Sequence, residues 1–192
     1  MDNEIIKEQE LLDAIKKAYD VEGNVIRKSR IEVFVKKELI PSVLLYVKEQ
    51  KGYHHLSHVA CIDRIEEGEF QLVFNIWSHA DKIMLYVKTR VKRDNPVMEN
   101  LDGIWDQLNT YEREFREMFG IEFTGLVGDK EFVLEDWDDM PPMRRDFDTV
   151  QYSKDHFYFR PGREDAQDVR KVLTDRTGEE IPDYATKYSR EK

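Results

Sequence analysis

The region from His54 to Lys92 constrains the fold more than any other part of the sequence. It holds three runs in which apolar and polar residues alternate, and short turns rich in glycine or polar residues separate them. The runs are HHLSHVACIDRI, EFQLVFNIW and KIMLYVKTRVK. In the third run Ile83, Leu85 and Val87 point to one side of a strand, and Tyr86 and Lys88 point to the other. One buried and one solvated face predicts an antiparallel meander.

Helical spacing of apolar residues brackets this meander. A first amphipathic helix is expected from Ile5 to about Tyr19, before Gly23, and a second from Pro41 to Gly52. Between them Ile31, Val33 and Val35 alternate as in a strand. After Pro96 the pattern again favours a helix, with apolar residues at positions 98, 101, 104, 105 and 108. The predicted class is therefore α+β, with a largely antiparallel sheet, helices packed on one face and an extended C-terminal segment.

Domain boundaries follow from the same pattern. Residues 1–123 are expected to form the α+β core domain, and residues 124–192 an extended partner-binding loop and C-terminal tail. From about Val150 the chain is expected to be extended, apart from a short helix across Arg163 to Leu173. The last residues lack the apolar content for a core of their own and are either disordered or bound against a partner.

Charge excludes one class of function. The chain has 192 residues and a formal net charge of −10, with charged residues at 36%. Nucleic-acid binding depends on neutralising phosphates with basic side chains. The one notable basic patch, at Lys88, Arg90, Lys92 and Arg93, is flanked by acidic segments. We therefore expect no nucleic-acid partner.

Cofactor binding by this chain is also not expected. The single cysteine, Cys61, permits no disulfide within the chain and no iron–sulfur cluster, and it is expected to be a small buried hydrophobe in a reducing compartment. His54, His55 and His58 resemble a metal cluster, but side chains of a strand alternate between faces, so His55 and His58 should diverge. We predict no metal site and no cofactor site.

Membrane contact is expected only through other chains. No apolar run approaches the ~20 residues of a transmembrane helix. The first ten residues are acidic and polar, which does not match a signal peptide.

The segment YEREFREMFGIEF, residues 111–123, predicts a short amphipathic helix. Asn109 is expected to cap it, with Glu112 completing a capping box, and Gly120 to end it in a left-handed conformation. One face carries Tyr111, Phe115, Met118 and Phe119. Surface ion pairs are expected between Glu112 and Arg116 and between Arg113 and Glu117.

A second mixed-charge run, LEDWDDMPPMRRDFD, covers residues 134–148. Its residue types leave two interpretations open, a solvated surface and a docking surface, because tryptophan, methionine and arginine are enriched at interfaces. A third interpretation treats Asp136, Asp138, Asp139 and Asp146 as a hydrolase or Mg²⁺ site. No P-loop, nucleophile elbow or HExxH motif accompanies these carboxylates, which argues against an enzyme.

The two segments together resemble the signature of the 30-kDa subunit family of respiratory complex I. The first matches at Glu112, Arg113, Glu114 and then at Met118 to Phe123, with Glu117 in place of the usual aspartate. The second matches at Glu135-Asp136-Trp137 and at Pro142 to Phe147. Residues 125–130 depart from the family's usual sequence between these motifs. The resemblance spans roughly residues 20 to 150.

Membership of this family would imply a non-catalytic scaffold subunit. The departure at 125–130 and the abundance of both charge signs, typical of thermophile proteins, make the chain most similar to the corresponding subunit of an archaeal membrane-bound [NiFe] hydrogenase. Alternatives are the equivalent subunit of a complex I type NADH/quinone oxidoreductase or of a membrane-bound sulfur (sulfane) reductase.

The resemblance also implies partners and a location. The partners would be a large catalytic subunit and an iron–sulfur small subunit, which would carry the [NiFe] centre and clusters, in an ion-translocating complex on the cytoplasmic side of the cell membrane. Reversing both Arg144 and Arg145 to Glu is expected to release the chain and leave its fold intact. The expected interface residues are Glu112, Arg113, Glu114, Arg116, Glu117, Trp137, Met143, Arg144, Arg145, Asp146 and Phe147.

Overall fold

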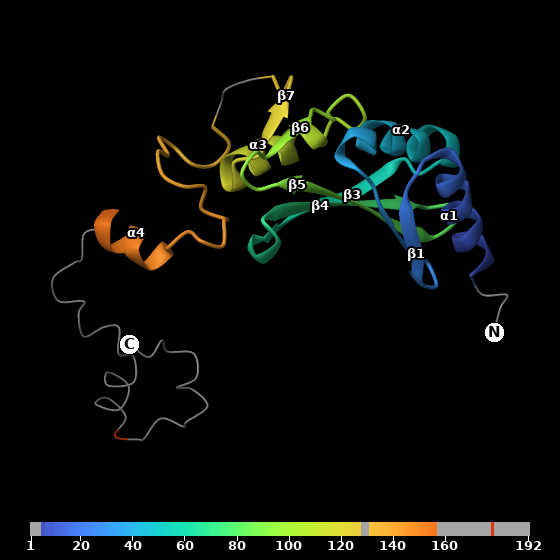
Figure 1. Ribbon diagram of the computed structural model, residues 1–192, viewed down its shortest axis with the longest axis horizontal. Helices are drawn as coiled ribbons and strands as arrows, with labels where there is room; N and C mark the ends of the chain where they lie inside the picture. The colour runs from blue at the N-terminus through green and yellow to red at the C-terminus, as the bar shows by residue number, and fades with distance from the viewer. Residues whose placement is uncertain (1–4, 128–130, 157–177, 179–192) are drawn as a thin grey trace. The chain divides into compact units, whose positions relative to one another are not determined.

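The computed structural model describes residues 5–127, 131–156 and Gly178, and the chain divides into two compact units at Phe147. The predicted helix across Arg163 to Leu173 lies outside the described residues. The first unit, residues 1–147, contains most of the secondary structure (Figure 1). Its elements are α1 (Ile6–Ala18), β1 (Glu22–Arg27), β2 (Arg30–Phe34), η1 (Lys37–Leu39), α2 (Ile40–Lys51), β3 (His55–Arg64), η2 (Ile65–Glu67), β4 (Glu69–Ser78), β5 (Ile83–Lys92), β6 (Val97–Glu99), α3 (Leu108–Phe119) and β7 (Glu122–Thr124).

A five-stranded sheet forms the centre of this unit, in the order β1-β2-β5-β4-β3. The predicted meander is confirmed: β3, β4 and β5 pair antiparallel, and Gly68, at φ 68°, closes the first turn. The N-terminal hairpin of β1 and β2 joins it through a parallel pair, in which Arg30 faces Met84 and Phe34 faces Lys88. The sheet is therefore mixed but mainly antiparallel, and the predicted α+β class is confirmed.

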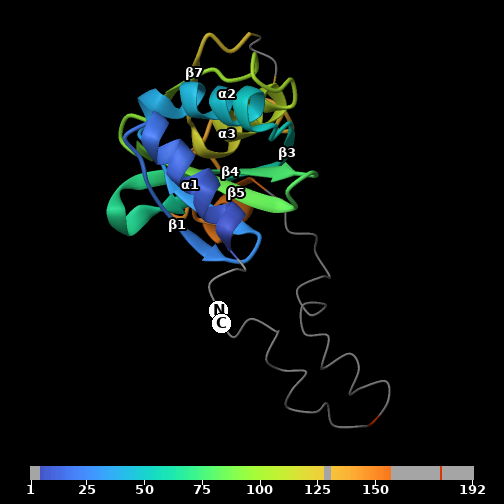
Figure 2. The same cartoon turned by 90° about the vertical axis from the view of Figure 1, so that its right-hand side faces the viewer.

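The apolar core lies between the sheet and the helices, which cover one of its faces (Figures 1 and 2). Leu12 and Ile15 from α1, and Val43, Leu44 and Val47 from α2, are buried there. The alternate residues of β5 that face the helices are buried as well. Full burial of such a side chain contributes ~1.5–3 kcal/mol, so packing on this single face accounts for much of the fold's stability.

The helix predicted between residues 98 and 108 is wrong. The chain there forms β6, which pairs in parallel with β7, and a series of turns. Tertiary contacts explain the difference: the indole Nε1 of Trp105 donates to the carbonyl of His54 at 2.8 Å, and Lys48 Nζ donates to the carbonyl of Ile104 at 2.6 Å. These residues are apolar because they fill the core edge, and their helical spacing does not produce a helix.

The second unit contributes α4 (Thr149–His156) to the described residues. Asp148 caps this helix, because its Oδ1 accepts hydrogen bonds from the backbone N–H groups of Val150 and Gln151 at 3.0 and 2.9 Å. The prediction of extended chain from about Val150 is therefore wrong for these eight residues. No helix among the described residues is long and apolar enough to cross a membrane.

Candidate partner interface

Helix α3 presents the apolar face that its spacing predicts. Phe115 and Phe119 are buried, and their rings meet edge to face with centroids 6.2 Å apart. Phe119 makes the same contact with Phe70 of β4 at 5.9 Å, and Tyr111 and Met118 pack on the core from the side. Edge-to-face pairs add ~0.5–1.5 kcal/mol beyond area burial. The helix is therefore fixed to the sheet along its whole length.

The predicted ends of α3 are half right. Gly120 has φ 74°, so the left-handed cap is confirmed, but the helix begins after Gln107 with no side-chain cap, so the capping box is wrong. Glu112 points into the protein instead, and its Oε1 accepts a hydrogen bond from the backbone N–H of Leu101 at 2.7 Å. Burial raises the pKa of this carboxyl to about 7. Glu112 therefore holds the turns of residues 100–107 in place, and the surface ion pair expected between Glu112 and Arg116 is wrong.

Glu117 binds the segment that leads into the second motif. Its carboxylate accepts hydrogen bonds from the backbone N–H groups of Phe132, Val133 and Leu134 at 2.6, 2.8 and 2.9 Å. Partial burial pushes the pKa of Glu117 upward, but these donors and the charge of Arg113 outweigh it and hold the pKa below its ordinary value. The carboxylate that was expected to pair with Arg113 on the surface thus holds a loop.

Arg113 holds the same loop from the preceding turn of α3. Its guanidinium donates to the carbonyl of Glu131 at 2.9 Å and lies 5.6 Å from the ring centroid of Phe132. Arg113 and Glu117 together therefore dock residues 131–134 on the helix.

Arg144 attaches the second motif to the end of α3. Its Nε donates to the carbonyl of Phe119 at 2.7 Å, and its guanidinium lies 5.3 Å from the ring centroid of Phe70. The neighbouring backbone N–H of Met143 donates to the carbonyl of Met118 at 3.0 Å. A Cβ at Gly120 would lie 2.9 Å from Arg144 Nη2. The glycine is thus required by its φ, and a Cβ there would also displace the tip of the Arg144 side chain.

An ion-pair network fixes the rest of this motif. Asp63, at the end of β3, is buried and accepts two hydrogen bonds from the guanidinium of Arg93 at 3.0 and 3.2 Å. The same carboxylate accepts the backbone N–H of Arg145 at 2.8 Å. Arg93 also pairs with Asp146, and this hydrogen bond lowers the pKa of Asp146. Arg145 reaches Glu66 at 2.6 and 2.7 Å on the surface and lowers its pKa.

Trp137 and Phe147 close the segment on itself. Their ring centroids lie 5.7 Å apart, and the indole Nε1 donates to the carbonyls of Asp139 and Met140. By these contacts residues 131–147, called the docking loop below, belong to the first compact unit. The sequence analysis placed the start of the partner-binding part between residues 123 and 124, and that boundary stays a prediction.

Most of the side chains that the docking loop leaves exposed are charged, but some of them are large and apolar. Val127, just before it, is 81% exposed, and within it Val133 is 64%, Met143 58% and Met140 39% exposed. Exposed apolar side chains on a loop that hydrogen bonds hold in place are candidates for an interaction site. Of the expected interface residues only Met143 is among these four; Val127, Val133 and Met140 were not in the expected set, and their place in an interface is a proposal. The signal that could have found them is an apolar residue within a run otherwise made of charges and turn residues.

The charged residues of the expected interface act mainly within the chain. The expectation that reversing both Arg144 and Arg145 leaves the fold intact stays a prediction, and the bond from the Arg144 guanidinium to the end of α3 argues against it. Arg145 is half-exposed, and its side chain bonds to Glu66 only at the surface. Whether these residues also touch a partner stays a prediction.

The histidines and the single cysteine were the other candidates for a site. His58 Nδ1 lies 3.3 Å from the hydroxyl of Tyr111, and the rings of His55 and His79 are 5.4 Å apart. The part of the chain that the structure describes contains no group of three or more side chains able to hold a metal ion. Cys61 is only partly buried, at the edge of the core, and burial raises the pKa of its thiol.

The expected basic patch is largely neutralised within the chain. Lys88 pairs with Glu32, Arg90 with Glu67 and Glu69, and Arg93 with Asp63 and Asp146. These contacts leave little free positive charge for phosphates.

Comparison with known proteins identifies the class to which this fold and loop belong. Residues 33–153 match the model of the family described as the respiratory-chain NADH dehydrogenase 30-kDa subunit. The matched range runs from β2 through the docking loop and covers more than half of the chain. The chain belongs to this family, and it is an accessory subunit of a complex I-type oxidoreductase.

Individual relatives come from several such enzymes. The chain is 32% identical over 132 residues to a subunit of the F420H2 dehydrogenase of Methanosarcina mazei, covering 66% of this chain and 81% of the relative. It is 32% identical over 120 residues to a subunit of the NADH-quinone oxidoreductase of Roseiflexus castenholzii, covering 60% and 68%.

Among solved structures, a chain of the membrane-bound sulfane sulfur reductase, an archaeal respiratory membrane complex, superposes with a TM-score of 0.72 at 27% identity. It covers 81% of this chain and 94% of that one. A trypsin-resistant fragment of Nqo5 shares the fold, with a TM-score of 0.54 at 18% identity over 64% of this chain and 99% of that one.

Proposed function

We propose that this protein is a scaffold subunit in the peripheral arm of a membrane-bound, complex I-type oxidoreductase. In this role it binds the large catalytic subunit through the docking loop and supplies no cofactor of its own. The observation that carries the proposal is the exposure of the apolar side chains of Val133, Met140 and Met143 on a loop that Glu117 and Arg144 hold in place. A surface already rigid before binding loses little conformational entropy on association.

The relatives favour the quinone-reducing and sulfur-reducing enzymes over the hydrogenase that the sequence first suggested. The relatives named above are an F420H2 dehydrogenase, an NADH-quinone oxidoreductase and a sulfane sulfur reductase. The redox centres of the complex then belong to other subunits, and the iron–sulfur small subunit is the second expected partner. The location that follows is the cytoplasmic side of the membrane, reached through those subunits.

Co-purification with a tagged copy of this chain tests the proposal. The expected result is a membrane-derived complex whose large subunit is identified by mass spectrometry, while the chain alone is colourless and inactive. Two CxxC pairs in that large subunit would assign a hydrogenase, and their loss would assign the quinone or sulfur branch. Recovery of the tagged chain without any other subunit contradicts the proposal.

A matched pair of variants tests the surface itself. Replacing Val133 and Met143 together by Glu places charge on the apolar part of the docking loop and should abolish co-purification without changing the melting temperature of the isolated chain. Leu45 on α2, 49% exposed, provides the control, since Leu45→Glu places a charge on an exposed apolar side chain elsewhere. Equal retention of both variants in the complex would exclude this surface as the docking contact.

A further inference from the structure

Strand β5 is longer than its neighbour on one side. It pairs with β4 along all ten residues, from Ile83 to Lys92, but β2 pairs only with residues 84–88. Beyond that point the chain leaves the sheet, since Val35 makes the last backbone bond to Lys88 and η1 begins at Lys37. On the side of β5 that faces β2, the residues after Lys88 are therefore left without a neighbouring strand.

The backbone groups at this edge point into open space. The N–H of Met84 donates to Ser29 and the carbonyl of Lys88 accepts from Val35, so even-numbered residues of β5 face the β2 side. Because strand backbone groups alternate in direction, the N–H and C=O of Arg90 face the same side. No strand of the described chain pairs with them. An unpaired edge of this kind is a template for another strand.

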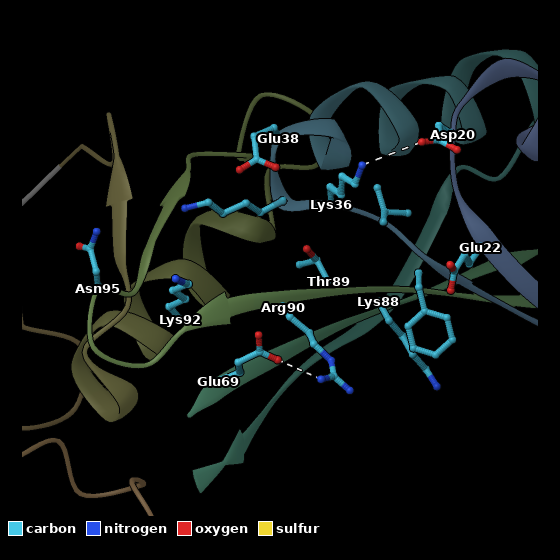
Figure 3. Close-up of a pocket in the computed structure, with 13 residues that line it drawn as sticks. Asp20, Glu22, Lys36, Glu38, Glu69, Lys88, Thr89, Arg90, Lys92 and Asn95 are labelled. Atoms are coloured by element: carbon cyan, nitrogen blue, oxygen red, sulfur yellow. Dashed lines mark hydrogen bonds and ion pairs between the residues drawn. The ribbon is translucent and has the colours of Figure 1, made fainter. Parts of the chain in front are cut away.

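A groove of about 800 Å³ lies along this edge (Figure 3). Its floor includes Thr89, which is 2% exposed and whose Oγ1 has no hydrogen-bond partner among the described residues. In Figure 3 Thr89 lies below Lys36. A buried hydroxyl without a partner costs ~1–3 kcal/mol; because this oxygen is buried, an occupant of the groove would bind the free backbone edge instead.

The charges on the rim differ between the two ends. Lys92 and Asn95 lie at one end and Glu22 at the other (Figure 3). Arg90 is paired with Glu69 at 2.9 Å, whereas Lys92, Glu22 and Glu38, which also lines the groove, make no ion pair with the described residues. An occupant with an acidic side chain at the Lys92 end and a basic one at the Glu22 end would complement both.

We propose that this groove receives an extended segment of a partner subunit, which adds to the free edge of β5 as a further strand. Backbone hydrogen bonds to Arg90 supply affinity, and the two rim charges supply specificity. This inference rests on the proposed function because it requires a partner subunit, and it places a second contact on the sheet in addition to the docking loop.

Hydrogen exchange in the purified complex and in the isolated chain tests the strand addition. The Arg90 amide should exchange at least about tenfold more slowly in the complex. The Val91 amide, which faces β4, serves as the internal control and should not change. Equal exchange of Arg90 in both samples overturns the inference.

A photo-crosslinking residue at Asn95 identifies the occupant, with the same residue at Lys17 on α1 as the control site. The expected product joins position 95 to an extended segment of another subunit, and Lys92→Glu should lower its yield about fivefold or more. A crosslink to residues 157–192 of the same chain, or to a second copy, overturns the inference.

The two proposals fail in different ways. If the complex forms but Arg90 stays unprotected and position 95 yields no product, only the strand addition is excluded. If no other subunit co-purifies, both proposals are excluded.

Discussion

The sheet with its helices and the docking loop are held together by different interactions. In the sheet region apolar side chains such as Ile15, Val47 and Phe74 point inward and most charges point out. In residues 131–147 the charges of Arg144 and Asp146 bond inward to the first region, and Val133 and Met143 remain outside.

This difference between the two regions indicates where partner contact is to be expected. Polar bonds supply most of the contacts that hold this loop in one conformation, so some of its apolar side chains, such as Val133 and Met143, remain available to a second protein. Phe70 connects the two regions, because it is fully buried in the sheet and the guanidinium groups of Arg93 and Arg144 both lie against its ring.

The largest expected effect separates the two regions. Phe74→Ala leaves a cavity under the helices and should lower the free energy of unfolding by ~3–5 kcal/mol. Thermal or urea unfolding of the isolated chain measures this. Because the loop's contacts do not include Phe74, co-purification at low temperature should persist; its loss would show that the regions are not independent.

Glu112 offers the next largest effect, and it depends on pH. Its folded-state pKa of about 7 lies above its unfolded value, so the folded state binds more protons between the two values and stability falls as pH rises through that window. Glu112→Gln should remove this pH dependence. At pH 8 the free energy of unfolding of this variant should exceed that of the native chain by up to ~3 kcal/mol. Unfolding curves at pH 4.5, 6 and 8 measure it; parallel pH profiles for both proteins would contradict the assigned burial effect.

Arg144→Ala should lower the free energy of unfolding by ~2 kcal/mol, because it leaves the carbonyl of Phe119 without its charged donor. Faster hydrogen exchange at the Met143 amide would accompany the loss. Arg145→Ala is the matched control, since its side chain binds Glu66 at the exposed surface and should cost under ~1 kcal/mol. Equal costs for the two arginines would remove the distinction between loop fixation and surface pairing.

The smallest effect concerns Glu117. Its folded-state pKa lies below the ordinary value, so its contribution is fully present above the unfolded pKa and is lost as pH falls through the folded pKa. Glu117→Gln should cost ~1–2 kcal/mol at pH 7 and should show a weaker loss of stability on acidification. Exchange rates of the Phe132 to Leu134 amides report the same change locally, and unchanged rates would contradict the assigned contacts.

Local patterns predicted the parts of the fold that local forces determine. The meander is evident because three alternating runs are joined by short turns, and Gly120 is evident because a glycine follows the last apolar residue of a helix. β1 gave no such signal. Its residues include Gly23 and Asn24, which disfavour strands, and most of its side chains are exposed.

Long-range contacts determined what the sequence could not reveal. Glu112 stands where a capping glutamate would stand, and only the position of the 100–107 turns makes it a buried acceptor. The same is true of Arg144, because a charged residue near two prolines looks like surface until Phe70 and the end of α3 are placed beside it. The family signature located both motifs but did not indicate which of their side chains face inward.

The parallel pairing of β2 with β5 also governs the order in which the chain can fold. Residue 30 meets residue 84, whereas β3, β4 and β5 need only short turns to find one another. Contacts between distant residues form slowly because the intervening loop must close first. The meander is therefore expected to nucleate folding, and the N-terminal hairpin can complete the sheet only after residue 88 has been synthesised.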